Sequence, residues 1–213
     1  SIIKKKGAIS CIRINENNKK KYYENILETE HHLSFPFIFE YKNCFYLIPE
    51  TSTIGSINIY KCVKFPYKWK FYKKLFKSKS VDHIIFKHKK NWYLLNNESD
   101  IKHIYSKLVG YINNNPLSNK WKKIKTLKNS FLLGRNAGYF EINQQKYRVS
   151  QSYLPGRYGA GVFINKIKNI SVKNYNESVE KKYFPKIFSK IKGIHTLNSV
   201  KNFTVFDISK WQN

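Results

Sequence analysis

The feature that most constrains this chain is a hairpin-like pattern that occurs three times. In residues 33–50 (LSFPFIFEYKNCFYLIPE), two apolar runs flank a polar turn at 40–43. Aromatic and β-branched residues around a Lys-Asn turn predict a β-hairpin. The pattern returns as IIFKHKKNWYLLNN and as GYFEINQQKYRVSQ, and each time a Phe precedes a Tyr by seven residues. The three pairs are Phe39 and Tyr46, Phe86 and Tyr93, and Phe140 and Tyr147.

The distance between these patterns predicts a fold. Successive patterns start about 47 and 54 residues apart, and self-similarity at periods of about 40–50 residues is typical of propeller blades. A blade needs four antiparallel strands, and alternating segments such as GSINIYKCV and PYKWKFYKKLF follow the hairpins. We therefore predict an all-β fold, a five-bladed β-propeller. The alternative is three unrelated hairpins in an aromatic-rich all-β protein.

A chain of 213 residues is expected to form one domain, so we predict a single propeller over 1–213. The expected repeat units are, in order, 31–79, 80–126 and 127–173. Residues 1–30 and 193–213 would form a partial closing blade, because strands shared between the termini remove free sheet edges. The N-terminal blade is expected to be incomplete. For the charged segment 174–192 we predict a short helix or a loop.

The chain carries 40 Lys and Arg residues against 13 Asp and Glu, a net charge of +27. Such a charge indicates an acidic partner. A second explanation is genomic base composition, because Lys, Asn, Ile, Tyr and Phe have A/T-rich codons and only four of the basic residues are Arg. Both explanations stay open. The lysines are spread over all units without a nucleic-acid-binding motif, so we do not expect nucleic acid as the partner.

The arginines are informative because Lys is the default cation of this chain. Three of the four lie between 135 and 157, namely Arg135, Arg148 and Arg157. The planar guanidinium binds a phosphate or carboxylate through two hydrogen bonds. Their grouping predicts an anion-binding role, with coincidence as the alternative.

The cysteines and histidines predict no metal site. Cys11, Cys44 and Cys62 lack metal-ligand spacing and lie in apolar patterns, so buried free thiols in a reducing compartment are expected. Adjacent residues of a strand point to opposite faces, so His31 and His32 are not expected to share a metal. No run of 18 apolar residues exists, and no transmembrane segment is predicted. We predict no metal and no cofactor, and a cytoplasmic protein, either free or peripheral to a membrane.

Five motifs resemble one known family. They are HLSFPFIFE…YLIPE (32–50), VDHIIF…WYLL (81–95), RNAGYFEI…YRVSQ (135–151), RYGAGVFINKI (157–167) and GIHTLNS…FTVFD (193–207). In this order the chain resembles the β-propeller domain at the N-terminus of plant glucosamine inositolphosphorylceramide transferases, which has bacterial relatives in surface-glycan pathways. The family usually has more chain before its GxIS-like strand, here 7–10, which implies that this chain is truncated at its N-terminus.

The family is itself similar to arabinanase-type five-bladed glycosidases, which the resemblance allows us to test residue by residue. Those enzymes use three carboxylates, each at the start of an inner strand of a different blade, and paired carboxylates are what glycoside hydrolysis needs. The matching positions here hold Ser34, Asp82 and Asn136. Only Asp82 keeps a carboxylate. Glu50 ends a second strand and could reach the central funnel of the propeller, which the carboxylates of those enzymes face. Asp82 and Glu50 are therefore the catalytic candidates of an incomplete triad, and hydrolysis ranks behind other functions.

The resemblance implies a carbohydrate-active domain in glycan or glycolipid biosynthesis, either a glycosyltransferase or the module that presents its acceptor. The alternative is a non-catalytic sugar-binding or scaffold propeller. Expected partners are an anionic sugar, a nucleotide-sugar or a glycolipid acceptor, with a fused or associated transferase domain.

The expected ligand-binding residues are His32, Ser34, Arg135, Arg148, Gln151, Arg157, Tyr158 and His195. For each of them, the alternative is a structural hydrogen bond at a strand end. We predict that Arg135, Arg148, Asp82 and His195 converge on one end of the central funnel.

Overall fold

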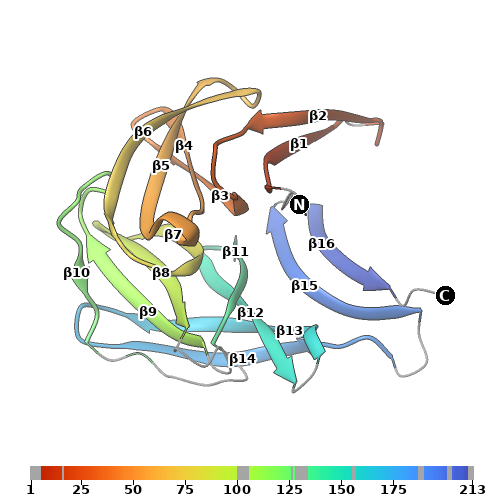
Figure 1. Ribbon diagram of the computed structural model, residues 1–213. Helices are drawn as coiled ribbons and strands as arrows, with labels where there is room; N and C mark the ends of the chain where they lie inside the picture. The colour runs from red at the N-terminus through yellow and green to blue at the C-terminus, as the bar shows by residue number, and fades with distance from the viewer. Residues whose placement is uncertain are drawn as a thin grey trace. The chain divides into compact units, whose positions relative to one another are not determined.

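The computed structural model describes nearly the whole chain. The described residues are 6–15, 17–99, 106–125, 127, 134–154, 157–186, 190–200 and 203–210. They form β-strands and one short 3-10 turn, η1 (Ser52–Ile54), so the all-β prediction is confirmed (Figure 1). The chain divides into two compact units, residues 1–92 with 113–120 and residues 93–112 with 121–213.

Three sheets have four strands each, in sequence order. The first contains β3 (Ser34–Tyr41), β4 (Cys44–Glu50), β5 (Ser56–Lys64) and β6 (Lys68–Lys77). The second contains β7 (Val81–His88), β8 (Asn91–Ser99), β9 (Ser106–Asn113) and β10 (Lys122–Lys123). The third contains β11 (Asn136–Ile142), β12 (Gln145–Leu154), β13 (Arg157–Ile170) and β14 (Tyr175–Tyr183). Two hairpins form separate two-stranded sheets, β1 (Ile9–Ile14) with β2 (Lys20–Leu27), and β15 (Ile191–Val200) with β16 (Phe203–Lys210).

The three predicted hairpins are β3–β4, β7–β8 and β11–β12. In the first, the turn residues Lys42 and Asn43 have φ values of 50° and 56°, as a two-residue type I′ turn requires. This turn makes Phe39 and Tyr46 direct cross-strand partners, whose rings stack with centroids 5.4 Å apart. The third hairpin repeats the arrangement, with the rings of Phe140 and Tyr147 5.1 Å apart. A seven-residue spacing across a two-residue turn is therefore the geometry of a stacked aromatic pair.

The third sheet extends beyond its expected end. The prediction of a helix or loop over 174–192 is wrong, because Tyr175–Tyr183 is the outer strand β14, paired antiparallel with β13. Lys181 and Lys182 of this strand are exposed. An outer strand with charged side chains on its solvent face resembles a loop in composition, which explains the wrong prediction.

Each unit has its own core. Leu33, Leu47, Tyr60 and Trp69 pack with Ile9 and Leu27 of the first hairpin in one unit. In the other, β15 packs against β11 and β13. The residues of that core are Ala137, Phe140, Val149, Val162 and Leu197. The three cysteines are free, as predicted, but they are half-buried rather than buried.

Candidate functional site

The starts of β3 and β7 have an unusual backbone. Phe35 and Asp82, each four residues before the buried Phe39 or Phe86, have φ values of 42° and 52°. Non-glycine residues in this left-handed region are uncommon. Such strain is often found at functional sites. The backbone of Phe35, which directly follows the predicted Ser34, thus matches that of Asp82.

Asp82 lies in a buried polar environment. Its exposed fraction is 1%, and so is that of the neighbouring His83. The ring Nε2 of His83 lies 3.2 Å from the Ser80 hydroxyl, to which the Ser78 hydroxyl donates a hydrogen bond of 2.8 Å. Burial lowers the pKa of His83 to about 4. The imidazole is therefore neutral at neutral pH and acts there as a hydrogen-bonding group.

Glu50 and Ser34 are brought together by the register of the first sheet. They are cross-strand partners at the ends of β4 and β3. The Ser52 hydroxyl donates to the Glu50 carboxylate over 3.0 Å, and Glu50 is half-buried. Strand β7, which carries Asp82, packs against both β3 and β4. The two catalytic candidates thus lie on neighbouring strands of one unit.

His32 has a structural contact. Its Nδ1 accepts a hydrogen bond of 2.9 Å from the backbone N–H of Gly7, and Gly7 in turn accepts from the N–H of Leu33. An accepting Nδ1 assigns the proton of a neutral imidazole to Nε2. His32 therefore fastens the N-terminal segment to the start of the first sheet.

In the other unit, His195 is held by a carboxylate that sequence reasoning did not select. Its Nδ1 lies 3.3 Å from Asp207, which also accepts the backbone N–H groups of His195 (3.0 Å) and Thr196 (2.5 Å). Partial burial acts to raise the pKa of Asp207, but these hydrogen bonds outweigh it and lower that pKa. A carboxylate on Nδ1 orients the ring and sets its tautomer. The pair has the chemistry of a group that binds a hydroxyl or moves a proton.

Glycine makes room for this pair. Gly159 of β13 has a φ of +63°, and a Cβ placed there would lie 3.3 Å from Cβ of His195. A side chain at 159 would be strained and would press on His195. The close approach of β13 to β15 therefore explains part of the motif RYGAGVFINKI.

Gln151 and Arg135 meet through the backbone. The N–H of Gln151 donates to the carbonyl of Arg135 over 2.8 Å, and its side-chain amide donates to the carbonyl of Asn136 over 3.0 Å. Gln151 is 3% exposed, while Arg135 is half-buried. Gln151 thus stabilises the start of β11 through hydrogen bonds to the carbonyl groups of Arg135 and Asn136.

Arg148 is fully buried in a polar network. Its guanidinium forms a two-fold ion pair with Glu177 of β14, and it donates to the carbonyl of Gly134 and to the Asn136 side chain. The Tyr175 hydroxyl donates to the same carboxylate over 2.5 Å. Burial alone would lower the pKa of Arg148, but Glu177 outweighs it and keeps that pKa above its usual value. Such contacts are what a structural role for Arg148 would predict, and that role is the alternative to ligand binding given above.

Two further predicted residues, Arg157 and Tyr158, lie at the start of β13, and their side chains are outside the described residues. The predicted convergence of Arg135, Arg148, Asp82 and His195 involves both units, and it stays a prediction. Sequence reasoning missed Asp207 and Glu177. Asp207 is the only carboxylate in the apolar strand FTVFDISK, which is a signal that could have found it.

Among the described residues, no group of three or more His, Cys, Asp or Glu side chains is arranged to hold a metal ion. The same residues include no helix that is long and apolar enough to cross a membrane.

Comparison with known proteins confirms the family resemblance. The sequence model described as "Glucosamine inositolphosphorylceramide transferase 1, N-terminal" matches residues 1–212. Glucosamine inositolphosphorylceramide transferase 1 of Arabidopsis thaliana is 34% identical over 162 residues, which cover 71% of this chain and 20% of that protein. Its namesake in Oryza sativa subsp. japonica is 29% identical over 157 residues, with 71% and 21% covered. The chain spans about a fifth of the length of these relatives.

Solved structures show the fold. The exo-β-1,3-galactanase of Phanerochaete chrysosporium, solved with β-1,3-galactotriose, matches 84% of this chain and 44% of its own with a TM-score of 0.61 and 10% identity. An exo-1,5-α-L-arabinanase from a bovine ruminal metagenomic library matches 80% and 61%, with a TM-score of 0.54 and 10% identity. These neighbours are β-propeller enzymes, so the fold is of the β-propeller type. By its sequence, this chain belongs to the family of glucosamine inositolphosphorylceramide transferase 1 N-terminal domains.

Proposed function

We propose that this chain is a carbohydrate-binding β-propeller domain that presents the acceptor in glycan or glycolipid biosynthesis. The observation that carries the proposal is the family match over residues 1–212, whose curated relatives are named transferases. The architecture that we propose is a single five-bladed propeller with an incomplete N-terminal blade. Its partners would be an anionic sugar, a nucleotide-sugar or a glycolipid acceptor, and a transferase domain.

We propose the pair His195–Asp207 as the centre of the sugar-binding site. Asp207 fixes the imidazole, and the absence of a side chain at Gly159 lets the backbone of β13 approach His195 closely. A fixed imidazole binds a sugar hydroxyl with little loss of side-chain entropy. We propose that Gln151 and Arg135 belong to the same ligand site as His195. Free cysteines suit a reducing compartment, which supports action in the cytoplasm or at its membrane surfaces.

A second candidate function is glycosyl transfer by this domain itself. The observation that favours it is the left-handed backbone of the buried Asp82, on a strand that packs against β4 with its Glu50. In this alternative, Asp82 and Glu50 would act as the acid–base pair. Substitution of Asp82 by Asn would then abolish transfer while leaving acceptor affinity unchanged.

Calorimetric titration with phosphate-free sugars tests the proposed function. The probes are glucosamine, myo-inositol and β-1,3-galactotriose. We expect saturable binding of at least one probe, weakened about three- to tenfold by His195→Ala, because a hydrogen bond contributes a net ~0.5–1.5 kcal/mol. Asp207→Asn should weaken it less, since the amide oxygen still accepts the two backbone N–H groups.

The matched control is Lys70→Gln, an exposed lysine of β6 in the other unit, which should leave the affinity unchanged. Absence of saturable binding to all three sugars would contradict the function. Equal affinity of the wild type and His195→Ala would remove His195 from the site.

A further inference from the structure

The hairpin β1–β2 carries cations opposite one another. Arg13 and Lys21 are direct cross-strand partners, and Ile14 is paired with Lys20. Arg13 and Lys21 are both exposed. Like charges directly opposite each other destabilise a strand pair. A bound anion would remove this repulsion.

Two tyrosines line the face that carries this pair. Cys11 and Tyr23 are the next partners on that face, and Nζ of Lys21 lies 5.3 Å from the centroid of the Tyr23 ring. The Tyr67 hydroxyl donates to the Tyr23 hydroxyl over 3.4 Å, and the two rings are 4.5 Å apart. Arg13 lies close enough to both hydroxyl groups to act toward lowering the pKa of each. The two cations are therefore placed beside a pair of hydroxyl groups.

The cations also line a recess. Its volume is about 240 Å³, and its residues are Arg13, Asn15, Lys19, Lys20 and Lys21. The Asn15 side chain accepts the backbone N–H groups of Asn17 (3.1 Å) and Lys19 (2.8 Å), which holds the turn in shape. A second recess of about 400 Å³ is again lined by Arg13 and Asn15. Arg13 and Asn15 thus line both recesses.

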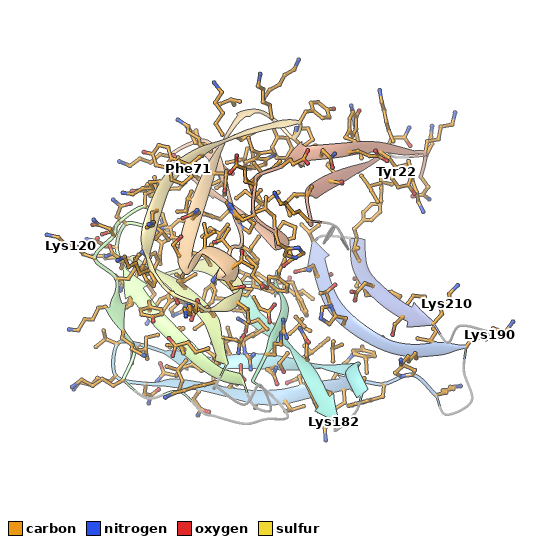
Figure 2. The ribbon with its side chains drawn as sticks, viewed as in Figure 1. Tyr22, Phe71, Lys120, Lys182, Lys190 and Lys210 are labelled. Atoms are coloured by element: carbon orange, nitrogen blue, oxygen red, sulfur yellow. The ribbon has the colours of Figure 1, made fainter. Side chains whose placement is uncertain are left out.

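Opposed lysines alone do not make such a site. Lys61 and Lys70 are cross-strand partners in β5–β6, as are Lys64 and Lys68. What distinguishes β1–β2 is Arg13, one of only four arginines in the chain, together with the recess and the tyrosines. The guanidinium fork matches two oxygens of one phosphate group. Tyr22, which is 65% exposed, lies with Ile12 on the opposite face and extends from β2 in Figure 2.

We propose that Arg13, Lys19 and Lys21 form a binding site for a phosphate group carried by a ligand. Arg13 holds two phosphate oxygens, and the two lysines neutralise the remaining charge. The Asn15 side chain keeps the turn, and with it Lys19, in position. This site uses none of the residues of the proposed function and does not depend on it.

Calorimetric titration with inorganic phosphate at physiological ionic strength tests the site. We expect Arg13→Ala to weaken phosphate binding about tenfold or more, as loss of a charge-assisted hydrogen bond predicts. Arg13→Lys should give an intermediate loss, because it keeps the charge and removes the fork. Lys70→Gln, which takes one charge from another opposed pair, should change the affinity less than about twofold. Equal losses in Arg13→Ala and Lys70→Gln would reduce the effect to net charge and overturn the proposal, as would no loss in either.

Two further titrations distinguish a lipid headgroup from a soluble nucleotide as the source of the phosphate group. One uses phosphatidylcholine vesicles with and without phosphatidylinositol, and the other uses UDP. Binding that depends on Arg13 in the first identifies a lipid headgroup, and in the second a soluble nucleotide. Arg13-independent binding in both would overturn the proposal. His195→Ala should leave every one of these titrations unchanged, so failure of this site and failure of the proposed function are distinguishable.

Discussion

Burial of His83 makes protonation of its side chain unfavourable in the folded protein. Its imidazole is 1% exposed, and burial lowers its pKa to about 4 from an ordinary value of 6.5. Between about pH 6.5 and pH 4, the His83 imidazole is protonated in the unfolded chain but stays neutral in the folded protein. Since the unfolded state then binds more protons, stability falls as the pH falls through this window. Above pH 6.5 the group is neutral in both states and contributes no pH dependence.

We therefore predict a pH dependence that His83→Gln removes. Between pH 7 and pH 4 the free energy of unfolding should fall by roughly 3 kcal/mol more in the wild type than in the variant. Urea denaturation at both pH values measures the difference, and carboxylates titrating in the same range cancel in the comparison. A parallel loss in both proteins, or an NMR titration of His83 near pH 6.5, would contradict the prediction.

At the residue scale, sequence reasoning selected polar side chains but not their partners. The family resemblance predicts Asp82 as a site residue from its place at the start of an inner strand, and the structure adds a left-handed backbone that no spacing rule contains. Arg148 was selected because arginine is rare here. Its partner Glu177 was missed, because that residue lies in β14, a strand predicted as a helix or loop. A buried ion pair is visible in sequence only when both strands are placed correctly.

At the scale of the strand pair, the stacked aromatic pairs of the first and third sheets have different neighbours. Trp92, the second residue of β8, packs edge-on against Phe39 with ring centroids 5.5 Å apart. The second residue of β16 is Thr204, and it lines a groove of about 420 Å³ whose wall includes Phe140 and Tyr147. The stacked pair of the third sheet therefore borders an open groove, where its counterpart in the first sheet packs against an indole ring.

We predict that Thr204→Trp fills this groove. The ring should bury apolar surface against Phe140 and Tyr147, raising the free energy of unfolding by about 1–2 kcal/mol. Thr204→Val is the matched control, because it removes the hydroxyl that lies 3.0 Å from Ser199 without adding a ring. It should cost about 0.5–1.5 kcal/mol. Thermal unfolding measures both variants, and a Trp variant no more stable than the Val variant would show that the groove cannot accept the ring.

Sequence patterns predicted the hairpins well, because a hairpin is determined by residues that are close together in the sequence. The hairpins β3–β4 and β11–β12 follow from turn residues that tolerate positive φ and from the seven-residue aromatic spacing. The outer strand β14 was missed although its partners in β13 lie only 5 to 21 positions away, because its charged solvent face resembles a loop and two bulges interrupt the register. Blade number depends on contacts between sheets, which no local pattern records, so five blades remain a proposal.

At the scale of the whole molecule, charge is the dominant property. The net charge is +27, and lysines such as Lys120, Lys182, Lys190 and Lys210 extend away from the strands in Figure 2. Charges of one sign repel one another and destabilise a compact state. Salt screens that repulsion, with a Debye length of about 10 Å at 0.1 M. The midpoint of thermal unfolding should therefore rise steadily from low salt to physiological salt.

Differential scanning fluorimetry in increasing sodium chloride measures this rise, and potassium chloride should give the same curve because screening depends on ionic strength alone.

The same measurement on lysine variants tests why the chain has so many lysines. If they reflect base composition, Lys70→Gln and other single exposed Lys→Gln substitutions should each raise the midpoint at low salt by a similar small amount. If they form a selected polyanion-binding surface, the gains should concentrate on one group of lysines, because those are held closest together. A midpoint that falls as salt increases would contradict the prediction, since attractive ion pairs that salt can screen, such as that between Lys146 and Glu141, would then outweigh the repulsion.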